Sequence, residues 1–128
     1  MFWSPNKVER RDDGRLSPCP TSPNCVCSHE GDAVHRIGPL KFSDSPHEAF
    51  QRLIALVTRQ PRTRVITHDE PYLHVEFMTP LLWFVDDVEF LLDDSAKVIH
   101  VRSASRVGHS DLGANRKRVE AIRRLFES

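Results

Sequence analysis

Two segments that alternate apolar and polar side chains flank a short turn-forming stretch, and this arrangement constrains the fold more than any other feature of the sequence. The segments are WFVDDVEFLL (83–92) and KVIHVRSASRV (97–107), with DDSA between them. Alternation with a period of two predicts a β-strand with one buried face, and a turn between two such strands predicts an antiparallel hairpin. We therefore expect strands over residues 84–92 and 97–106.

The register of this hairpin follows from matching apolar with apolar side chains across the strands. It places Phe90 opposite Ile99, and Asp86 opposite Ser103, on the face that we expect to contact the core. A carboxylate on such a face is costly unless it is paired or hydrogen-bonded. We therefore expect Asp86→Ala to destabilise the protein more than Asp87→Ala.

The opposite face of the hairpin is expected to be solvated, because its side chains are charged or polar. Cross-strand ion pairs on such a face stabilise a sheet by only about 0.2–1 kcal/mol each. The expected pairs are Asp87 with Arg102 and Glu89 with His100.

A helix and a second hairpin are predicted before these strands. Ser45 is a suitable N-cap, Pro46 suits the first helical position, and Pro61 ends the helix. Residues 63–78 alternate as a hairpin with its bend at Asp69–Glu70.

A second helix is predicted over residues 110–128, with Ser110 or Asp111 as its cap. Apolar residues recur along it at helical spacing, so one face is expected to contact the core. The expected stripe is Leu112, Val119, Ile122 and Phe126.

The order of these elements predicts an α+β fold, with a four-stranded antiparallel sheet and two helices, over residues 35–128. Residues 1–34 contain all three cysteines and show no regular period, so we expect an irregular Pro/Cys-rich arm that is ordered only where it docks. A length of 128 residues is typical of one domain with one core.

Composition narrows the class of partner. Eighteen basic and eighteen acidic side chains balance, whereas a generic nucleic-acid-binding domain carries a basic excess. No apolar run approaches the roughly 18 residues of a transmembrane helix, and the first residues do not resemble a secretory leader. We therefore expect no nucleic acid, no transmembrane segment and, on this ground alone, a cytoplasmic location.

A candidate site lies where the core face of the hairpin turns polar toward the last helix. Asp86 is the unusual residue there, and the start of a helix adds backbone N–H groups and a positive dipole. Three interpretations remain open: a structural network, a pocket for a small polar or anionic ligand, or a small hydrolase with Asp86 as general base. The residues expected to converge are Asp86, Ser103, Ser105, Arg106, Asp111, Asn115 and Arg116.

The three cysteines lie close together, at Cys19, Cys25 and Cys27. The C-x2-C spacing of zinc sites is absent, so neither a metal nor another cofactor is expected. The cysteines are either free thiols or, in an oxidising compartment, include a Cys19–Cys25 disulfide.

Leu81, Leu82 and Trp83 bring apolar bulk to a connection between strands. This loop either folds onto the core or beneath the arm, or it forms the lip of a pocket or a contact surface for a partner or a membrane.

Three stretches resemble a known family, namely CPTSPNCV (19–26), FVDDVEF (84–90) and RSASRVGHSDLGANRKR (102–118). From about residue 18 onward the chain is similar to domain-of-unknown-function family 1499, small bacterial and plastid proteins. The resemblance implies no activity, cofactor or catalytic residue. Because some members are exported, lipid-anchored or directed to plastids, it implies an envelope or organelle location as the alternative and favours the Cys19–Cys25 bridge.

Overall fold

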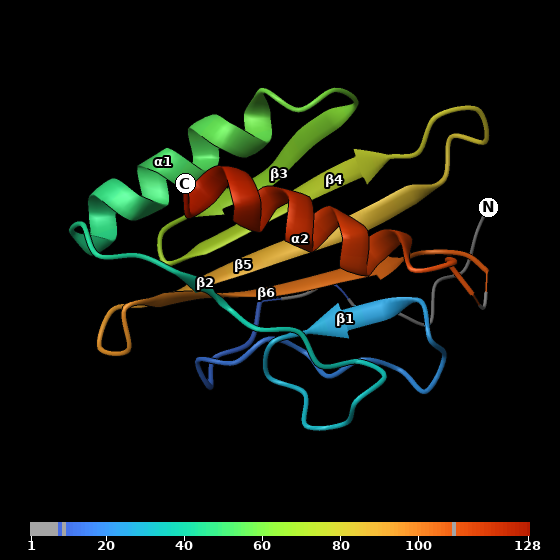
Figure 1. Cartoon of the computed structure of the whole chain (residues 1–128), viewed down its shortest axis with the longest axis horizontal. Coiled ribbons are helices and arrows are strands. Elements are labelled where there is room, and N and C mark those ends of the chain that lie inside the picture. Colours follow the sequence, from blue (N-terminus) through green and yellow to red (C-terminus); the bar gives the residue numbers. More distant parts are fainter. Residues whose placement is uncertain (1–7, 9, 109) are drawn as a thin grey trace.

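The structure of the protein, a computed structural model, describes residue 8, residues 10–108 and residues 110–128 (Figure 1). It confirms the α+β class, with an antiparallel sheet and two helices, but the sheet has six strands rather than four. The first residues of the expected arm lie outside the described part of the chain. The strands are β1 (Cys25–Cys27), β2 (Leu40–Lys41), β3 (Thr63–Asp69), β4 (Tyr72–Met78), β5 (Val85–Asp93) and β6 (Val98–Ser105), and the helices are α1 (Pro46–Thr58) and α2 (Ala114–Phe126).

The sheet has the order β1-β6-β5-β4-β3, and β2 also pairs with β6. The two strands that the sequence does not predict, β1 and β2, are three and two residues long. Such short strands complete less than two periods of alternation, so they leave no pattern in the sequence. Through β1, part of the expected irregular arm becomes an integral strand of the sheet.

Both helices lie across one face of the sheet (Figure 1). Helix α1 begins as predicted, because the Ser45 hydroxyl accepts the N–H of Glu48 and Pro46 occupies the first turn. Burial of its apolar stripe against the sheet is the main source of its stability. The buried apolar residues that join the helices to the sheet include Phe50, Leu53 and Val57 of α1 and Val119, Ile122 and Phe126 of α2.

Helix α2 begins later than predicted, at Ala114, and Gly113 is its N-cap with φ 80°. The Asp111 carboxylate nevertheless stabilises the first turn, because it accepts the N–H groups of Gly113 and Asn115. Leu112 therefore precedes the helix and is 87% exposed, so its predicted place in the core stripe is wrong.

The predicted hairpin of β5 and β6 forms, but its register differs from the prediction by two positions. Phe90 lies opposite Val101 rather than Ile99, and Asp86 lies opposite Ser105 rather than Ser103. Asp93 pairs with Val98, so the four-residue turn lies at 94–97 rather than at 93–96, and the Asp93 carboxylate accepts hydrogen bonds from Ser95 and Ala96 within it. A shift of two positions leaves every side chain on its predicted face.

The second face of the sheet is not solvated, which corrects the expectation for this face. Asp87, Glu89 and Arg102 are all 1% exposed or less. The segment before β1 lies against this face, and its Pro18 accepts a hydrogen bond from Arg102. Leu16 of that segment packs with Cys27 and Tyr72 in a small apolar cluster. The expected pairs also change: Glu89 faces Arg102, and His100 faces Leu91. Both faces of the sheet are therefore covered, one by helices and one by the arm.

Candidate functional site

Asp86 is buried and paired on the helix-covered face, as the alternation predicts. Its side chain is 2% exposed and its Oδ2 lies 2.7 Å from Nη2 of Arg118 on α2. Burial raises the pKa of Asp86 above its ordinary value, although the charge of Arg118 and a hydrogen bond with Ser105 oppose this effect. Asp86 is thus a partnered carboxylate whose environment favours proton uptake.

Asn115 ties the start of α2 to the sheet. Its Nδ2 donates to Ser105 Oγ at 2.8 Å and to Asp111 Oδ2 at 2.7 Å. Its Oδ1 accepts from Ser103 Oγ at 2.6 Å. Partial burial acts to raise the pKa of Asp111, but hydrogen bonds from Asn115 and nearby backbone N–H groups outweigh burial and lower it.

The structure brings together most of the residues that the sequence prediction names. The prediction names Arg106, but this residue lies apart from the others, on the arm-covered face with Asp87 and Glu76. It also includes Arg116, which instead donates to the backbone oxygens of Val34 and Arg36. It misses Arg118, although the i, i+3 spacing from Asn115 places both residues on one side of a helix. The predicted residues that lie together are Asp86, Ser103, Ser105, Asp111 and Asn115.

A cavity of about 340 Å³ lies beside this network, between the β4–β5 loop and the loop that leads into α2. Its polar lining consists of Asp86, Ser105 and Asp111 together with Thr79 and Ser110. Most of the remaining wall is apolar, and it includes Pro80, Leu82, Phe84, Val107, Leu112 and Ala114.

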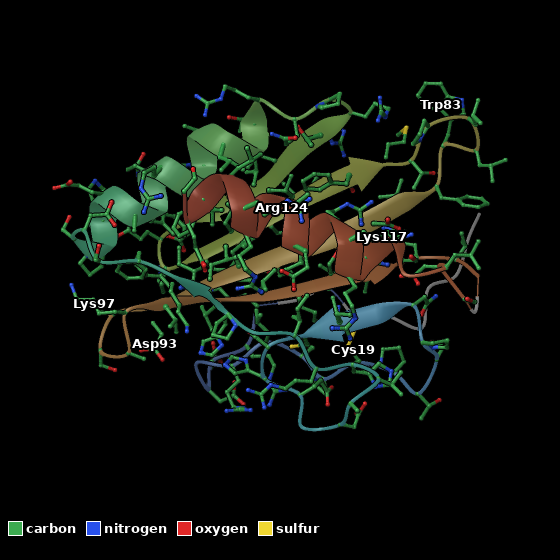
Figure 2. The ribbon with its side chains drawn as sticks, viewed as in Figure 1. Cys19, Trp83, Asp93, Lys97, Lys117 and Arg124 are labelled. Carbon is green, nitrogen blue, oxygen red and sulfur yellow. A yellow bond between two sulfur atoms is a disulfide. The ribbon has the colours of Figure 1, made fainter. Side chains whose placement is uncertain are left out.

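The β4–β5 loop projects apolar side chains outward. Leu81, Leu82 and Trp83 are 90%, 68% and 64% exposed, so they fold neither onto the core nor beneath the arm (Figure 2 labels Trp83). Leu82 also lines the cavity. The loop therefore forms a lip of this cavity and an exposed surface at the same time.

A larger hollow, of about 490 Å³, lies at the other end of the domain and is a weaker candidate for a ligand site. Two of the carboxylates that line it already have cationic partners, because Arg52 donates to both oxygens of Asp44 and Glu127 pairs with Arg123. We therefore assign the candidate site to the smaller cavity beside Asp86.

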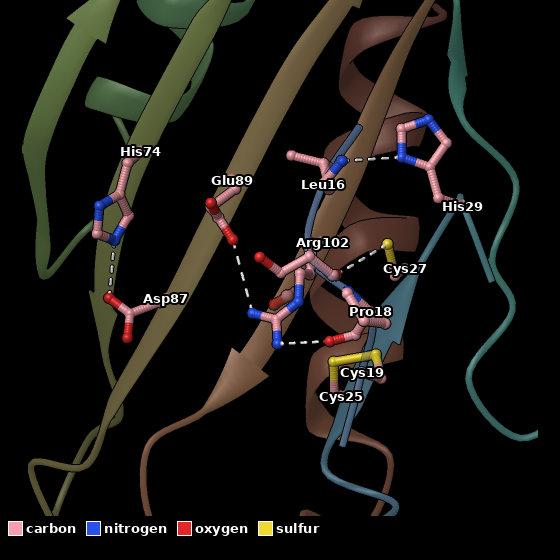
Figure 3. Close-up of polar contacts among 12 residues, drawn as sticks. Leu16, Pro18, Cys19, Cys25, Cys27, His29, His74, Asp87, Glu89 and Arg102 are labelled. Atoms are coloured by element: carbon pink, nitrogen blue, oxygen red, sulfur yellow. Dashed lines mark hydrogen bonds and ion pairs between the residues drawn. A yellow bond between two sulfur atoms is a disulfide. The ribbon is translucent and has the colours of Figure 1, made fainter. Parts of the chain in front are cut away.

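The arm-covered face holds a second buried polar network that the sequence prediction misses (Figure 3). Asp87 accepts from His74 at 2.8 Å and from Arg106 at 2.7 Å. Burial acts to raise the pKa of Asp87, but these hydrogen bonds outweigh burial and hold the pKa below its ordinary value. This network joins β4, β5 and β6, and we interpret it as structural.

Glu89 and Arg102 form a closely apposed buried pair beneath the arm. Nη1 of Arg102 lies 3.6 Å from Oε1 of Glu89, and its Nη2 donates to the backbone oxygen of Pro18 at 3.3 Å (Figure 3). Tyr72 donates its hydroxyl to Glu89. Burial raises the pKa of Glu89, with Tyr72 and Arg102 opposing the effect. Arg102 thus connects the sheet to the arm.

A serine, a histidine and an aspartate also align at the edge of the arm, where the sequence gives no signal. Ser28 Oγ lies 2.9 Å from Nδ1 of His100, and Nε2 of His100 lies 3.7 Å from Asp93. The Ser28 hydroxyl accepts the N–H of Val101, and the residue is 7% exposed. A nucleophile must reach its substrate, so this array is better explained as a structural link between arm and sheet.

The arm carries the predicted disulfide between Cys19 and Cys25, and Cys27 is a buried free thiol. Burial raises the pKa of Cys27, which keeps the thiol protonated. Among the described residues, no three or more His, Cys, Asp and Glu side chains gather as metal ligands. No described helix is long and apolar enough to cross a membrane.

We expect the double variant Cys19→Ser/Cys25→Ser to lose about 2 kcal/mol of stability, because a short closed loop restricts the unfolded chain. The loosened arm should also expose Cys27, so iodoacetamide should label Cys27 faster than in the oxidised wild-type protein. Mass spectrometry of timed samples measures this rate. Equal labelling rates would mean that the disulfide does not hold the arm over Cys27.

Comparison with known proteins identifies one family. A family model described as "Protein of unknown function (DUF1499)" matches residues 15–126 of the chain. No curated protein and no solved structure gives a significant match. The family match covers both the arm-borne disulfide and the network around Asn115.

Proposed function

We propose a function from the structure, since the chain belongs to the DUF1499 family of proteins of unknown function. In this proposal the domain is a binding module for a small amphipathic ligand. The ligand has an apolar body and a hydrogen-bond donor at one end, and it occupies the cavity beside Asp86. The apolar body contacts the wall formed by Leu82, Phe84 and Leu112, and the donor reaches the carboxylates.

The observation that carries this proposal is a mostly apolar cavity that also presents two carboxylates, those of Asp86 and Asp111. Ligand pockets are usually apolar, with a few polar groups that fix orientation. The basic residue expected here, Arg106, lies on the other face of the sheet, and backbone N–H groups at the start of α2 are bound to Asp111. These features favour a cation or a neutral donor over an anion.

A small hydrolase is the second candidate, because a cavity and a raised pKa at Asp86 are features of a general base. The carboxylate is, however, held by Arg118 and buried. An enzyme of this kind would need Asp86 to release that ion pair before it accepts a proton. The geometry therefore supports binding better than catalysis.

The test uses n-octylamine, n-octanol and n-octanoate, which share one apolar body and differ in the polar end. We expect NMR titration of the full chain to give saturable shifts around the cavity, with n-octylamine binding at least about tenfold tighter than n-octanoate. Equal affinities for the amine and the carboxylate, or shifts that do not saturate, would contradict the proposal.

Matched variants localise the binding. Leu112→Asn removes one apolar wall residue, and asparagine tolerates the positive φ of this position. We expect it to weaken n-octylamine binding about tenfold, because the bound ligand would bury part of the Leu112 side chain and full burial of a leucine contributes about 1.5–3 kcal/mol. Leu125→Asn is the control, since Leu125 is exposed on the last turn of α2, away from the cavity.

A further inference from the structure

Two loops at one end of the molecule carry its most exposed apolar side chains. They are the β4–β5 loop and the loop before α2, which lie at the right-hand end of Figure 1 and line one cavity. Leu81 is 90% exposed, Trp83 is 64% exposed and Leu112 is 87% exposed. We call the surface formed by Leu81, Leu82, Trp83, Phe84 and Leu112 the loop patch.

The backbone of the loop patch adopts a conformation that residues of these types disfavour. The φ angles of Leu81, Trp83 and Leu112 are 71°, 58° and 53°. The left-handed conformation costs an L-residue with a bulky side chain about 1–2 kcal/mol. Glycine or asparagine would adopt it at lower cost, so leucine and tryptophan at these positions serve something other than loop closure.

Backbone hydrogen bonds hold the β4–β5 loop in this conformation. The N–H of Thr79 donates to the backbone oxygen of Phe84, and the N–H of Trp83 donates to that of Thr79. The Thr79 hydroxyl also accepts the N–H of Phe84. The outward direction of Leu81 and Trp83 is therefore built into the closed loop.

Basic side chains flank the loop patch. Arg62 is exposed and donates from Nε to the backbone oxygen of Met78, at the base of the β4–β5 loop. Lys117 is exposed, and its Cε would lie 3.9 Å from a Cβ placed on Gly113, next to Leu112. Of the nearby carboxylates, Glu76 pairs with Arg106 and Asp86 pairs with Arg118. Arg62 and Lys117 thus place exposed positive charge at the edge of the patch.

From these observations we infer that the loop patch docks on an anionic phospholipid bilayer by inserting Leu81, Trp83 and Leu112 into the interface. Leucine and tryptophan are the side chains that enter the boundary between headgroups and acyl chains, and flanking Lys or Arg contacts anionic headgroups. Leu112 lines the cavity, and Leu81 and Trp83 belong to the loop that supplies Leu82 and Phe84 to its wall, so docking would turn the proposed binding site toward the lipid.

A bilayer fits this surface better than a protein partner does. A stable protein interface uses about 20–30 residues on each side and a continuous complementary face. The loop patch has few side chains, and they project separately from two loops. A fluid lipid surface needs no matching shape, so isolated apolar side chains are enough to bind it.

The test uses the full chain with Trp3→Phe, which leaves Trp83 as the single tryptophan, since the chain has two. Vesicles of phosphatidylcholine with a minor fraction of phosphatidylglycerol are compared with vesicles of phosphatidylcholine alone. We expect co-sedimentation with the mixed vesicles and a blue shift of Trp83 emission. Leu81→Asn should weaken partitioning about tenfold, as removal of one inserted apolar side chain implies.

Two controls separate docking from other outcomes. Leu125→Asn removes an exposed leucine from the other end of α2 and should leave partitioning unchanged. Arg62→Gln/Lys117→Gln should reduce binding to the mixed vesicles and leave the weaker binding to phosphatidylcholine intact. Leu81 is not part of the cavity wall, so Leu81→Asn should bind n-octylamine like the wild type, which keeps this inference separable from the proposed function.

Three results would overturn the inference. One is an unchanged Trp83 emission spectrum with both vesicle types. The second is binding that persists in Leu81→Asn and disappears only at high salt, which indicates surface attraction without insertion. The third is self-association or binding of another protein that Leu81→Asn abolishes while vesicles have no effect, which assigns the patch to a protein contact.

Discussion

Arg102→Ala is expected to lower the free energy of unfolding by about 3–5 kcal/mol, the range for removing one partner of a buried ion pair. Arg102 is 1% exposed and faces Glu89, which is fully buried. Without the guanidinium, the Glu89 carboxylate would remain buried with the Tyr72 hydroxyl as its donor. The backbone oxygen of Pro18 would lose its link to the sheet as well.

Urea denaturation measures this loss, with Arg124→Ala as the matched control. Arg124 is exposed on α2, and its replacement should change stability by less than about 0.5 kcal/mol. The double variant Glu89→Gln/Arg102→Met removes both buried charges and should recover much of the loss. If Arg102→Ala behaves like Arg124→Ala, the arm does not bury this pair.

The polar residues on the helix-covered face were predictable because the sequence patterns that place them extend over only a few residues. Alternation assigns Asp86 and Ser105 to one side of their strands, and a two-position error in register preserves that assignment. The start of α2 supplies the remaining members, because Asp111 and Asn115 lie within one turn. Elements and faces therefore followed from short-range patterns.

The choice among the basic residues was not predictable in the same way. Arg116 and Arg118 point to different sides of α2, because each residue turns a helix by about 100°. Arg118 meets Asp86, whereas Arg116 meets the backbone of Val34 and Arg36. The prediction begins the helix at residue 110 or 111, whereas Gly113 at positive φ delays it to Ala114. That delay also leaves Leu112 in solvent rather than in the core.

The prediction that the arm-covered face is solvated was wrong for a different reason. A strand that presents Asp87 and Glu89 is normally solvated on that side, because charged side chains are rarely buried unless they are paired. The partners come from distant segments, such as His74 on β4 and Pro18 in the arm. The periodicity of a strand does not identify the distant segment that covers it, so the second polar network could not be predicted from the sequence.

This burial reverses the expected order of two substitutions. We now expect Asp87→Ala to cost about 3 kcal/mol, because its carboxylate accepts charge-assisted hydrogen bonds from His74 and Arg106 in a buried site. Asp86→Ala should cost about 1–2 kcal/mol, because Arg118 keeps a hydrogen bond to Asn115 and a contact over the Phe77 ring. Matched urea melts at neutral pH measure both, and a larger loss for Asp86→Ala would restore the original expectation.

The contributions of Asp86 and Asp87 to stability should depend on pH in opposite directions. Because the pKa of Asp87 is lowered by folding, its contribution is present above the unfolded-state pKa and is lost as the pH falls through the folded-state pKa, below about 3.8. The pKa of Asp86 is raised, so its contribution is complete below about 3.8 and is lost as the pH rises through the folded-state pKa.

Comparison with Asp86→Asn isolates this linkage, since the asparagine does not titrate. As the pH falls from neutral toward about 4, the wild-type protein should gain stability relative to Asp86→Asn. Relative to Asp87→Asn, the wild-type protein should show no such gain over that range, because the carboxylate of Asp87 remains ionised. Parallel stability curves for wild type and Asp86→Asn would mean that Arg118 fully offsets the burial of Asp86, which would remove the general-base candidate and leave only the binding role for this carboxylate.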